Sequence, residues 1–449
     1  MKKIIAMLLA LVMLLSLAAC AGTAKTDTAA PADDTSKTDT TDTAAEPADT
    51  TEPADTTAEP VVTEEPTAAT KADGSAYKVA MICDSSINDG GWGAACYNAM
   101  IAAAERKGWQ AEVTDSISQD AYYDSIVAYC MLGYDMIYAP GNQYTDAVLQ
   151  AAEEYPDVQF VAMTGDTARA DGLANFHNAF TGIYEARYVG GVVAGMKLQQ
   201  LIDEGKVEDK NKTADGKIKI GYVGAYPYAE VVSGYTAFFL GLQSIVPDVA
   251  MQVQYTNSWF NITAENEAAK ALIADGCIIV SQHADSTGAP SACQEALDAG
   301  TTVYCVGYNV DMLAVAPTAA LTSPTNVWEV FYEYAFNAVM NGESFDQNWC
   351  QGYEADAVTL TPLGESCAPG TQEKVDETIA AIKDGSLHVF DTSKFTVGGE
   401  TVTSAFATDT DGDFTPDADE AIFDGYYHES YFQSAPSFQL RIDGITELN

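Results

Sequence analysis

Aromatic side chains occupy several turns of this sequence in which small residues are more usual. Trp92, Tyr226, Trp259 and Tyr308 each come shortly after a short apolar run. A flat aromatic face stacks on another planar ring, and such stacking contributes about 1–3 kcal/mol per nucleic-acid base. Two such faces on opposite sides of a site are therefore expected to clamp a planar ligand. For each ring taken alone, core packing is the alternative.

Neutral and acidic polar groups accompany these rings. The candidates to bond the edge of a bound ring are Asn142, Glu230, Gln282 and Asp285. The candidates to line the site or to close it are Asp84, Asn309, Asp311 and Asn326. Arg and Lys are absent from these turns. An anionic ligand more often needs an arginine fork, so the set favours a neutral heterocycle, although helix N-termini also bind anions.

Acidic residues in such turns have a structural alternative as helix caps or turn formers. This alternative applies most to Asp89 and Asp166. This alternative predicts that their carboxylates bond nearby backbone N–H groups.

The elements that must position these residues alternate between strands and helices. In the first half, the pattern predicts strands at 78–83, 110–113, 136–139, 159–163 and 172–176. It restarts at 217–223, after a polar insertion at 203–215. Parallel strands linked by helices form sheets covered on both faces, and ligands bind outside the carboxyl ends of such strands. The sequence thus predicts a two-lobed α/β hinge binder, with one large α/β enzyme domain as the alternative.

The N-terminus has the features of an export signal. A basic start precedes an apolar run at 4–17, which is shorter than the roughly 20 residues that a membrane span needs. The run ends in Leu17-Ala18-Ala19-Cys20, which looks like a bacterial lipobox. We expect residues 1–20 to be a lipoprotein signal peptide with Cys20 as the lipidation site. Residues 21–75, rich in Thr, Ala, Pro and acidic residues, are predicted to be a disordered tether.

The remaining chain is long enough for more than one core. We expect residues 76–184 to form the first lobe, together with a crossover helix near 327–345. Residues 185–326 are expected to form the second lobe, and residues 346–449 an extension packed on the lobes.

Composition and missing motifs limit the function classes. The chain has 65 acidic and 21 basic residues, for a net charge of −44, which argues against nucleic acid as a partner. No GxSxG, P-loop or HExxH motif is present, and Gly90-Gly91-Trp92-Gly93 lacks dinucleotide-binding spacing. We therefore expect a protein that is not an enzyme and that needs no cofactor.

Cysteines and one acidic loop leave two questions open. Cys350 and Cys367 lie in a late polar segment, where a disulfide and two free thiols are equally compatible with the sequence. The remaining body cysteines lie in apolar patterns and are expected to be buried. Asp409, Asp411 and Asp413 have calcium-loop spacing, but Phe414 stands where an EF-hand needs Gly, so an acidic hairpin is the alternative.

Several stretches, taken in order, resemble the basic membrane protein family, whose members are substrate-binding lipoproteins of ABC importers and include purine nucleoside receptors. The matching stretches are Cys83–Trp92, Glu185–Gly195 (EARYVGGVVAG), Lys217–Leu242, Asn257–Asp275, Ser281–Ser286 and Val306–Thr322. The resemblance covers about residues 77–389. It implies a two-lobed periplasmic-binding-protein type I-like fold, in which two parallel sheets flanked by helices meet at a hinge, and it implies no catalytic activity.

The resemblance also implies roles for single residues. In nucleoside-binding members an aromatic ring from each lobe sandwiches the base, and these positions match Trp92 and Trp259. The early Asp of the family matches Asp84.

Three positions depart from the family pattern. Asn309 and Asn326 stand where members carry Asp and Lys, and Gly93 stands where they carry Asn. Because these departures remove sugar-type contacts, the sequence favours a purine nucleobase, with a nucleoside next.

The resemblance thus predicts a monomeric, extracytoplasmic protein. A lipid anchor would hold it on the cell membrane, and it would deliver a purine to ABC permease subunits. The ligand-binding module of a sensory system is the alternative.

Overall fold

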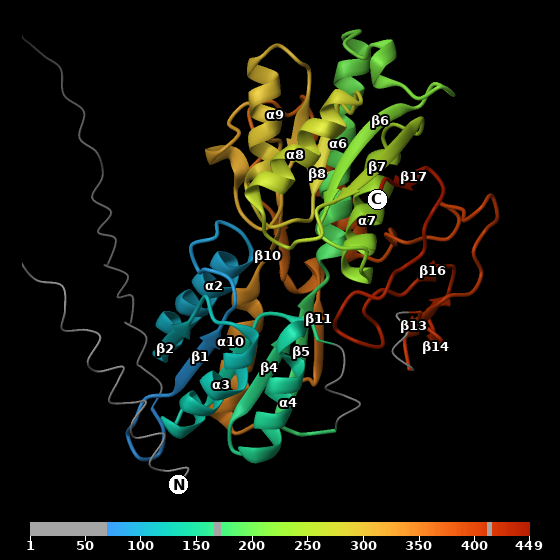
Figure 1. The fold of residues 1–449 in the computed structure, drawn as a ribbon. Coiled ribbons are helices and arrows are strands. Elements are labelled where there is room, and N and C mark those ends of the chain that lie inside the picture. Colours follow the sequence, from blue (N-terminus) through green and yellow to red (C-terminus); the bar gives the residue numbers. More distant parts are fainter. Residues whose placement is uncertain (1–69, 166–171, 411–414) are drawn as a thin grey trace, which may run out of the picture. The chain divides into compact units, whose positions relative to one another are not determined.

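The computed structural model describes residues 70–165, 172–410 and 415–449 (Figure 1). All of these residues belong to one compact unit. The predicted signal peptide, the Cys20 lipidation site and nearly all of the predicted tether lie outside the described residues, as do Asp166, Asp411 and Asp413.

The first sheet is entirely parallel and has the strand order β11-β5-β4-β3-β1-β2. Its strands are β1 (Lys78–Ile82), β2 (Gln110–Thr114), β3 (Met136–Ala139), β4 (Gln159–Met163), β5 (Phe176–Thr181) and β11 (Asn348–Gln351). Successive side chains of a strand point to opposite faces, and both faces of β1 and β3 are buried. This burial requires helices on each side of the sheet.

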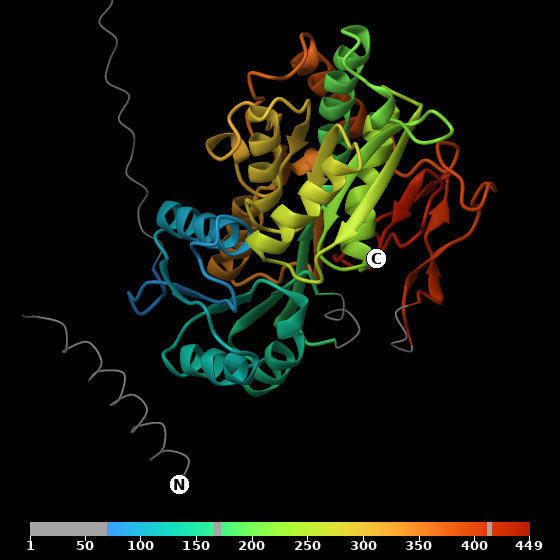
Figure 2. The same cartoon turned by 45° about the horizontal axis from the view of Figure 1, so that its top comes forward.

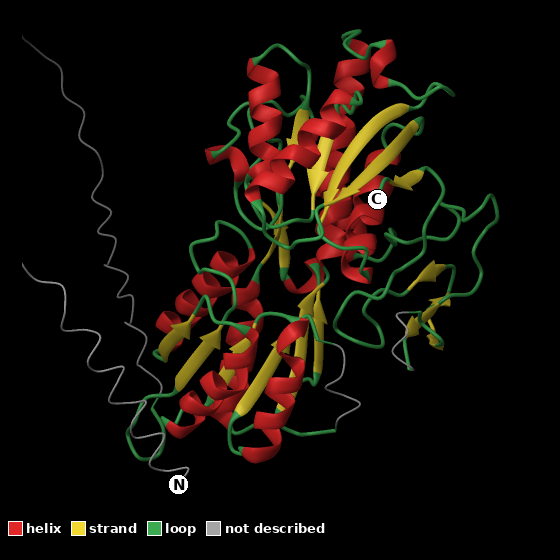
Figure 3. Ribbon diagram, in the orientation of Figure 1, coloured by secondary structure: helices red, strands yellow, loops and turns green. Residues whose placement is uncertain are grey.

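Four helices cover this sheet. Val79 and Met81 of β1 share a core with α2 (Trp92–Lys107) and α10 (Trp328–Asn341), which pack on each other. Ala80 and Ile82 point the other way, into a second core with α3 (Tyr122–Met131) and α4 (Thr145–Glu154). We call the sheet and these helices the first lobe (Figure 3).

Strand β5 begins where the predicted strand at 172–176 was expected to end, so that prediction is wrong. Polar residues inside β5 hid the strand in the sequence. His177 is buried and bonds the Asp346 carbonyl and the Gln159 side chain at 3.0 Å each, and the Asn178 amide donates to the Ala162 carbonyl at 3.1 Å. Because these polar groups have partners, the strand tolerates them in its interior.

The second sheet is also parallel and has the order β17-β7-β6-β8-β9. Its strands are β6 (Ile218–Gly224), β7 (Val249–Tyr255), β8 (Ile279–Gln282), β9 (Tyr304–Val306) and β17 (Ile445–Glu447). Four helices accompany it, with α6 (Ile183–Asp203) packed on α7 (Ala229–Gln243) and α8 (Ile262–Ala274) packed on α9 (Gly288–Asp298). We call this group the second lobe.

Glycines set the spacing between α6 and α7. A Cβ at Gly191 would lie 2.1 Å from the Phe238 carbonyl oxygen, and one at Gly241 would lie 2.0 Å from that of Tyr188. Any larger side chain would push the helices apart, which explains the glycines in the EARYVGGVVAG stretch.

Three chain segments connect the lobes. The first runs from β5 into α6. The second holds β10 (Pro324–Asn326), which pairs antiparallel with β12 (Val358–Leu360) and leads into α10. Asn326, which was expected in a turn, is the last residue of this short strand. The third follows β11, where the Gly182 N–H donates to the Gln351 carbonyl at 2.8 Å and Tyr353 N–H donates to Glu185 Oε2 at 2.8 Å.

The chain after β12 returns to both lobes. Helix α11 (Thr371–Lys383) packs on α6. Two small antiparallel pairs follow, in which β13 (Phe406–Thr408) pairs with β14 (Ala418–Glu420) and β15 (Ile422–Phe423) pairs with β16 (Tyr426–Tyr427). Figure 2 shows this segment, in red, beside β7, in agreement with the β17–β7 pairing. Ser434 Oγ donates to the Gly165 carbonyl of the first lobe at 3.0 Å.

No helix in the described part of the chain is both long enough and apolar enough to cross a membrane.

Candidate functional site

Most of the candidate residues lie at carboxyl ends of strands, where the sequence placed them. Trp92 begins α2 after β1, Glu230 lies in the first turn of α7 after β6, and Trp259 follows β7. Gln282 ends β8, and Asp285 follows it. Since the strands of a parallel sheet share one carboxyl edge, these side chains gather at one edge of each sheet.

The Trp92 indole is fixed on the first lobe. Its Nε1–H donates to the Pro140 carbonyl at 2.7 Å. Its ring stacks on Phe180, with centroids 6.3 Å apart and planes at 27°, and meets the edge of Trp328 at 5.5 Å. Trp328 is fully buried. These contacts hold Trp92 in one orientation while the ring stays partly exposed.

The second lobe carries a group of aromatic rings at its own edge. Tyr226 meets Trp259 at 5.6 Å with planes at 60°, and it stacks on Tyr228 at 5.2 Å. Trp259 is partly exposed, and Tyr228 and Phe260 are exposed. The group presents aromatic surface beside the loop that carries Asp285, because the Asp285 N–H donates to the Trp259 carbonyl at 2.8 Å.

The two lobes approach each other closely at Gly91. A Cβ on Gly91 would lie 1.9 Å from the carbonyl oxygen of Asp285. The loop that ends at Gly91, directly before Trp92, therefore lies against the loop of Asp285, whose N–H bonds the Trp259 carbonyl.

Asp89 holds that loop in place and fulfils the predicted capping role. Its carboxylate accepts from the N–H groups of Gly91 at 2.8 Å, Gly93 at 2.8 Å and Ala94 at 3.0 Å.

Four side chains form a hydrogen-bonded series that joins the lobes, which we call the inter-lobe network: Asp285, Asn309, Asn326 and Thr181. The Asn309 amide donates to Asp285 Oδ1 at 2.9 Å, and the Asn326 amide donates to Asn309 Oδ1 at 3.0 Å. Thr181 Oγ1 donates to Asn326 Oδ1 at 2.5 Å. Asn309, Asn326 and Thr181 are all buried, so these hydrogen bonds are shielded from water.

A second series runs inside the second lobe and ends at Glu230. We call it the buried relay: Arg187, Tyr222, His283 and Glu230. Arg187 Nη1 donates to the Tyr222 hydroxyl at 2.7 Å and to the Gln282 carbonyl at 2.9 Å. Tyr222 Oη lies 3.4 Å from His283 Nδ1, and His283 Nε2 lies 3.5 Å from Glu230 Oε1.

The relay is buried except at its end. Arg187 is 1% exposed, with its guanidinium 3.8 Å from the centroid of the Tyr308 ring, and His283 is fully buried. The Glu230 side chain keeps 20% exposure. Glu230 is therefore the member of the buried relay that is partly accessible from outside the second lobe.

Burial shifts the protonation of these groups. It raises the pKa of Glu230 to about 7, against an opposing effect of the nearby Arg187 charge. It also raises the pKa of Asp285 well above the usual range, with Glu230 as a further cause. Burial and the Arg187 charge lower the pKa of His283 well below its usual value, so this imidazole is neutral.

The remaining candidates have mixed positions. Asp84 is exposed and accepts from Tyr122 Oη at 3.0 Å and Gln143 Nε2 at 3.1 Å, while Asn142 is exposed at the start of a 3₁₀ turn (Asn142–Tyr144). Asp311 caps a similar turn by accepting from the Leu313 N–H at 2.8 Å. The Gln282 amide donates to the Ala284 and Ser286 carbonyls at 2.7 and 2.8 Å, which favours a bracing role over contact with a ligand.

Reasoning from turns missed Arg187, Tyr222 and His283. Arg187 comes from a helix, so the absence of Arg from the turns did not exclude a cation near the site. The available signal was one arginine inside the otherwise apolar EARYVGGVVAG stretch, because a buried charge needs partners.

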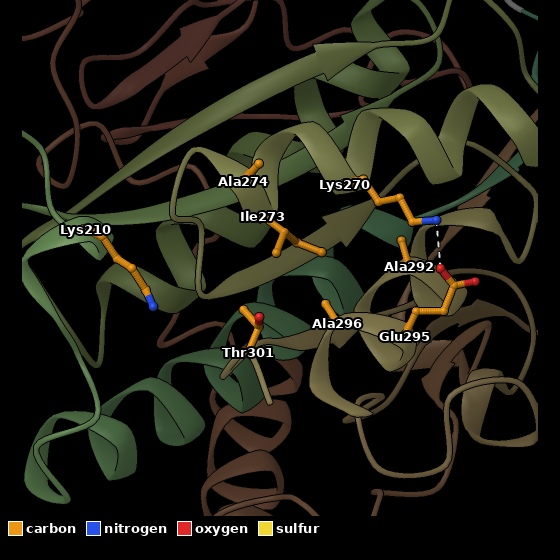
Figure 4. A pocket seen from close by; sticks show the side chains of 8 residues that line it. All are labelled: Lys210, Lys270, Ile273, Ala274, Ala292, Glu295, Ala296 and Thr301. Carbon is orange, nitrogen blue, oxygen red and sulfur yellow. Dashed lines mark ion pairs between the residues drawn. The ribbon is translucent and has the colours of Figure 1, made fainter. Parts of the chain in front are cut away.

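A surface depression of about 450 Å³ lies elsewhere, between the C-terminal part of α8 and α9. Figure 4 shows Lys270 and Glu295 pointing toward each other across it, with their charged atoms 2.7 Å apart. None of the candidate residues lines it.

The cysteine and calcium questions have different outcomes. Cys350 and Cys367 are free thiols in this structure, and Cys367 Sγ donates to the Leu321 carbonyl at 3.3 Å. The six other body cysteines are buried, as expected. The calcium loop stays a prediction, because two of its three Asp residues lie outside the described ranges.

Comparison with known proteins gives matches over the same region. The family model of PnrA-like ABC transporter substrate-binding proteins matches residues 76–383. A purine-binding protein of Brucella abortus is 32% identical over 70% of this chain and 83% of its own length. A putative ABC transporter glucose-binding protein of Haloferax volcanii is 30% identical over 71% of this chain and 74% of its own.

Among solved structures, an ABC transporter solute-binding protein from Conexibacter woesei has the same fold. It is 20% identical, with a TM-score of 0.56, and the match covers 70% of this chain and 98% of that one.

Proposed function

Since the chain belongs to the family of PnrA-like ABC transporter substrate-binding proteins, we propose that its ligand is a purine nucleobase, held between the two lobes. Members of this family bind a small molecule outside the cytoplasm and work with ABC permeases.

The inter-lobe network is the observation that carries the choice of a base over a nucleoside. Asn309 and Asn326 stand where the family pattern places Asp and Lys. Here they bond each other, the Asn309 amide also donates to Asp285, and the Asn326 oxygen also accepts from Thr181. Because a buried amide that already has partners offers little to a ribose hydroxyl, a ligand without a sugar fits better.

The aromatic residues support a planar ligand. Trp92 on the first lobe and Trp259 on the second lobe are both partly exposed. Trp92 directly follows Gly91, which lies against Asp285, and the Asp285 N–H donates to the Trp259 carbonyl. The Brucella relative is named for purine binding and the Haloferax relative for glucose, at similar identity. Sequence identity therefore does not distinguish a purine from glucose, and the choice of ligand rests on the residues of the site.

A thermal-shift panel tests this proposal. The full-length protein is mixed in turn with nucleobases, nucleosides, glucose and amino acids. A ligand at about 100 times its dissociation constant adds roughly 2.7 kcal/mol to the free energy of unfolding. We expect a clear rise of the melting temperature with a purine base. A rise with glucose alone would leave the family assignment intact and refute the purine proposal.

We further propose that residues 1–20 are a lipoprotein signal peptide and that Cys20 carries the lipid. Anchoring of this kind needs more than one acyl chain, which lipidation of an N-terminal cysteine supplies. In a bacterial host that processes lipoproteins, a Cys20→Ala variant is expected to leave the membrane fraction. Fractionation followed by immunoblotting measures this, with Cys367→Ala as the control. A Cys20→Ala protein that stays membrane-bound would contradict the anchor.

A further inference from the structure

The buried relay ends at a carboxylate that faces outward, and its hydrogen bonds have a direction. An arginine only donates, so Tyr222 Oη accepts from Arg187 Nη1 at 2.7 Å. The hydroxyl proton of Tyr222 then has His283 Nδ1, at 3.4 Å, as its acceptor. We infer that Nδ1 carries no proton, because only this tautomer accepts the Tyr222 hydroxyl proton.

This direction fixes the state of the next two groups. A neutral imidazole whose Nδ1 accepts must hold its proton on Nε2. His283 Nε2–H then points at Glu230 Oε1, 3.5 Å away, and donates to it. Glu230 Oε1 is thus occupied from inside the protein, which leaves Oε2 to interact with a ligand.

From this geometry we propose that Glu230 selects the ligand by accepting a hydrogen bond from an exocyclic amino group on its ring. Arg187, Tyr222 and His283 are positioning residues that hold Glu230 as an acceptor. The inference rests on the proposed function and names the class of base as an aminopurine.

The surroundings of Glu230 agree with this role. Besides the relay, the titratable groups that face it are Asp285, in the loop after β8, and Tyr308, in the loop after β9. Asp285 is already bonded to Asn309. That bond uses Asp285 Oδ1, and on Glu230 no side chain of the relay or the network bonds Oε2.

Protonation of Glu230 provides a readout that a purely structural role would not change. Burial raises its pKa to about 7. A ligand that needs the ionised form binds fully above this value, and its affinity falls by up to about tenfold per pH unit below it.

The experiment compares adenine with unsubstituted purine, which has the same ring without the amino group. Both are titrated into the full-length protein by calorimetry between about pH 5 and about pH 8. At the upper end, wild type is expected to prefer adenine by at least about tenfold, the effect of one hydrogen bond to a charged group. Glu230→Ala should bind the two bases with similar affinity. Glu230→Gln should keep part of the preference and lose the pH dependence.

Tyr222→Phe tests the relay without removing Glu230. It removes the proton donor that fixes His283, so the midpoint of the pH profile should move upward while the preference for adenine at the upper pH remains. An unmoved midpoint would overturn the relay. A Glu230→Ala variant that keeps the full preference would overturn the role of Glu230. Failure of wild type to bind any purine base would instead refute the proposed function.

Discussion

A Gly91→Ala variant is expected to bind its ligand roughly 150-fold more weakly than wild type. The added Cβ would lie 1.9 Å from the Asp285 carbonyl oxygen, and neither backbone segment is a flexible side-chain end that could move aside. Overpacking of this kind costs about 3 kcal/mol at the upper end of its usual range, which corresponds to the stated loss. Opening of the lobes would separate Gly91 from Asp285, so the cost falls on the closed form.

Calorimetry of ligand binding and a melting curve without ligand measure this together. The melting temperature of the ligand-free variant should fall much less than the affinity does. Asn88→Ala, at an exposed position in the same loop, is the matched control and should bind like wild type. Equal affinity of Gly91→Ala and wild type would mean that this contact is not part of the ligand-bound form.

Replacing either tryptophan by alanine should weaken binding of a purine base about 5- to 150-fold. The range follows from about 1–3 kcal/mol for each base–aromatic stack. Titration of Trp92→Ala and Trp259→Ala with adenine gives both values.

Two further variants separate stacking from stability. Trp92 also packs on Phe180 and Trp328, so Trp92→Phe, which keeps a ring, should lose less affinity than Trp92→Ala. Tyr431→Ala, at an exposed position in the C-terminal segment, should change nothing. Full affinity in Trp92→Ala and Trp259→Ala would refute a stacked ligand.

Much of the fold was predictable because parallel sheets leave a regular alternation in the sequence. The strand expected at 136–139 matches β3, and the strand expected at 159–163 matches β4. The prediction failed at β5, where His177 and Asn178 are buried polar residues with partners from distant parts of the chain. It also failed at β10, since the pairing of β10 with β12 depends on a segment more than 30 residues later.

The candidate site was predictable where it depends on strand ends and unpredictable where it depends on helices. Placement after strands identified Trp92, Glu230, Trp259 and Asp285. The Arg187 side chain reaches the site from α6, and the contact with Tyr222 exists only after α6 packs against the second sheet. The Asn309–Asn326 bond likewise joins the loop after β9 to strand β10, which the sequence pattern treats separately.

The central claim is that the site takes a purine base without its sugar, and side-by-side calorimetric titration with adenine and adenosine tests it most directly. With Asn309 and Asn326 bonded to each other, the full-length protein is expected to bind adenine at least about tenfold more tightly than adenosine, since an unpaired buried polar group costs about 1–3 kcal/mol. Equal or tighter binding of adenosine would contradict the account and would mean that the inter-lobe network rearranges to accept a ribose.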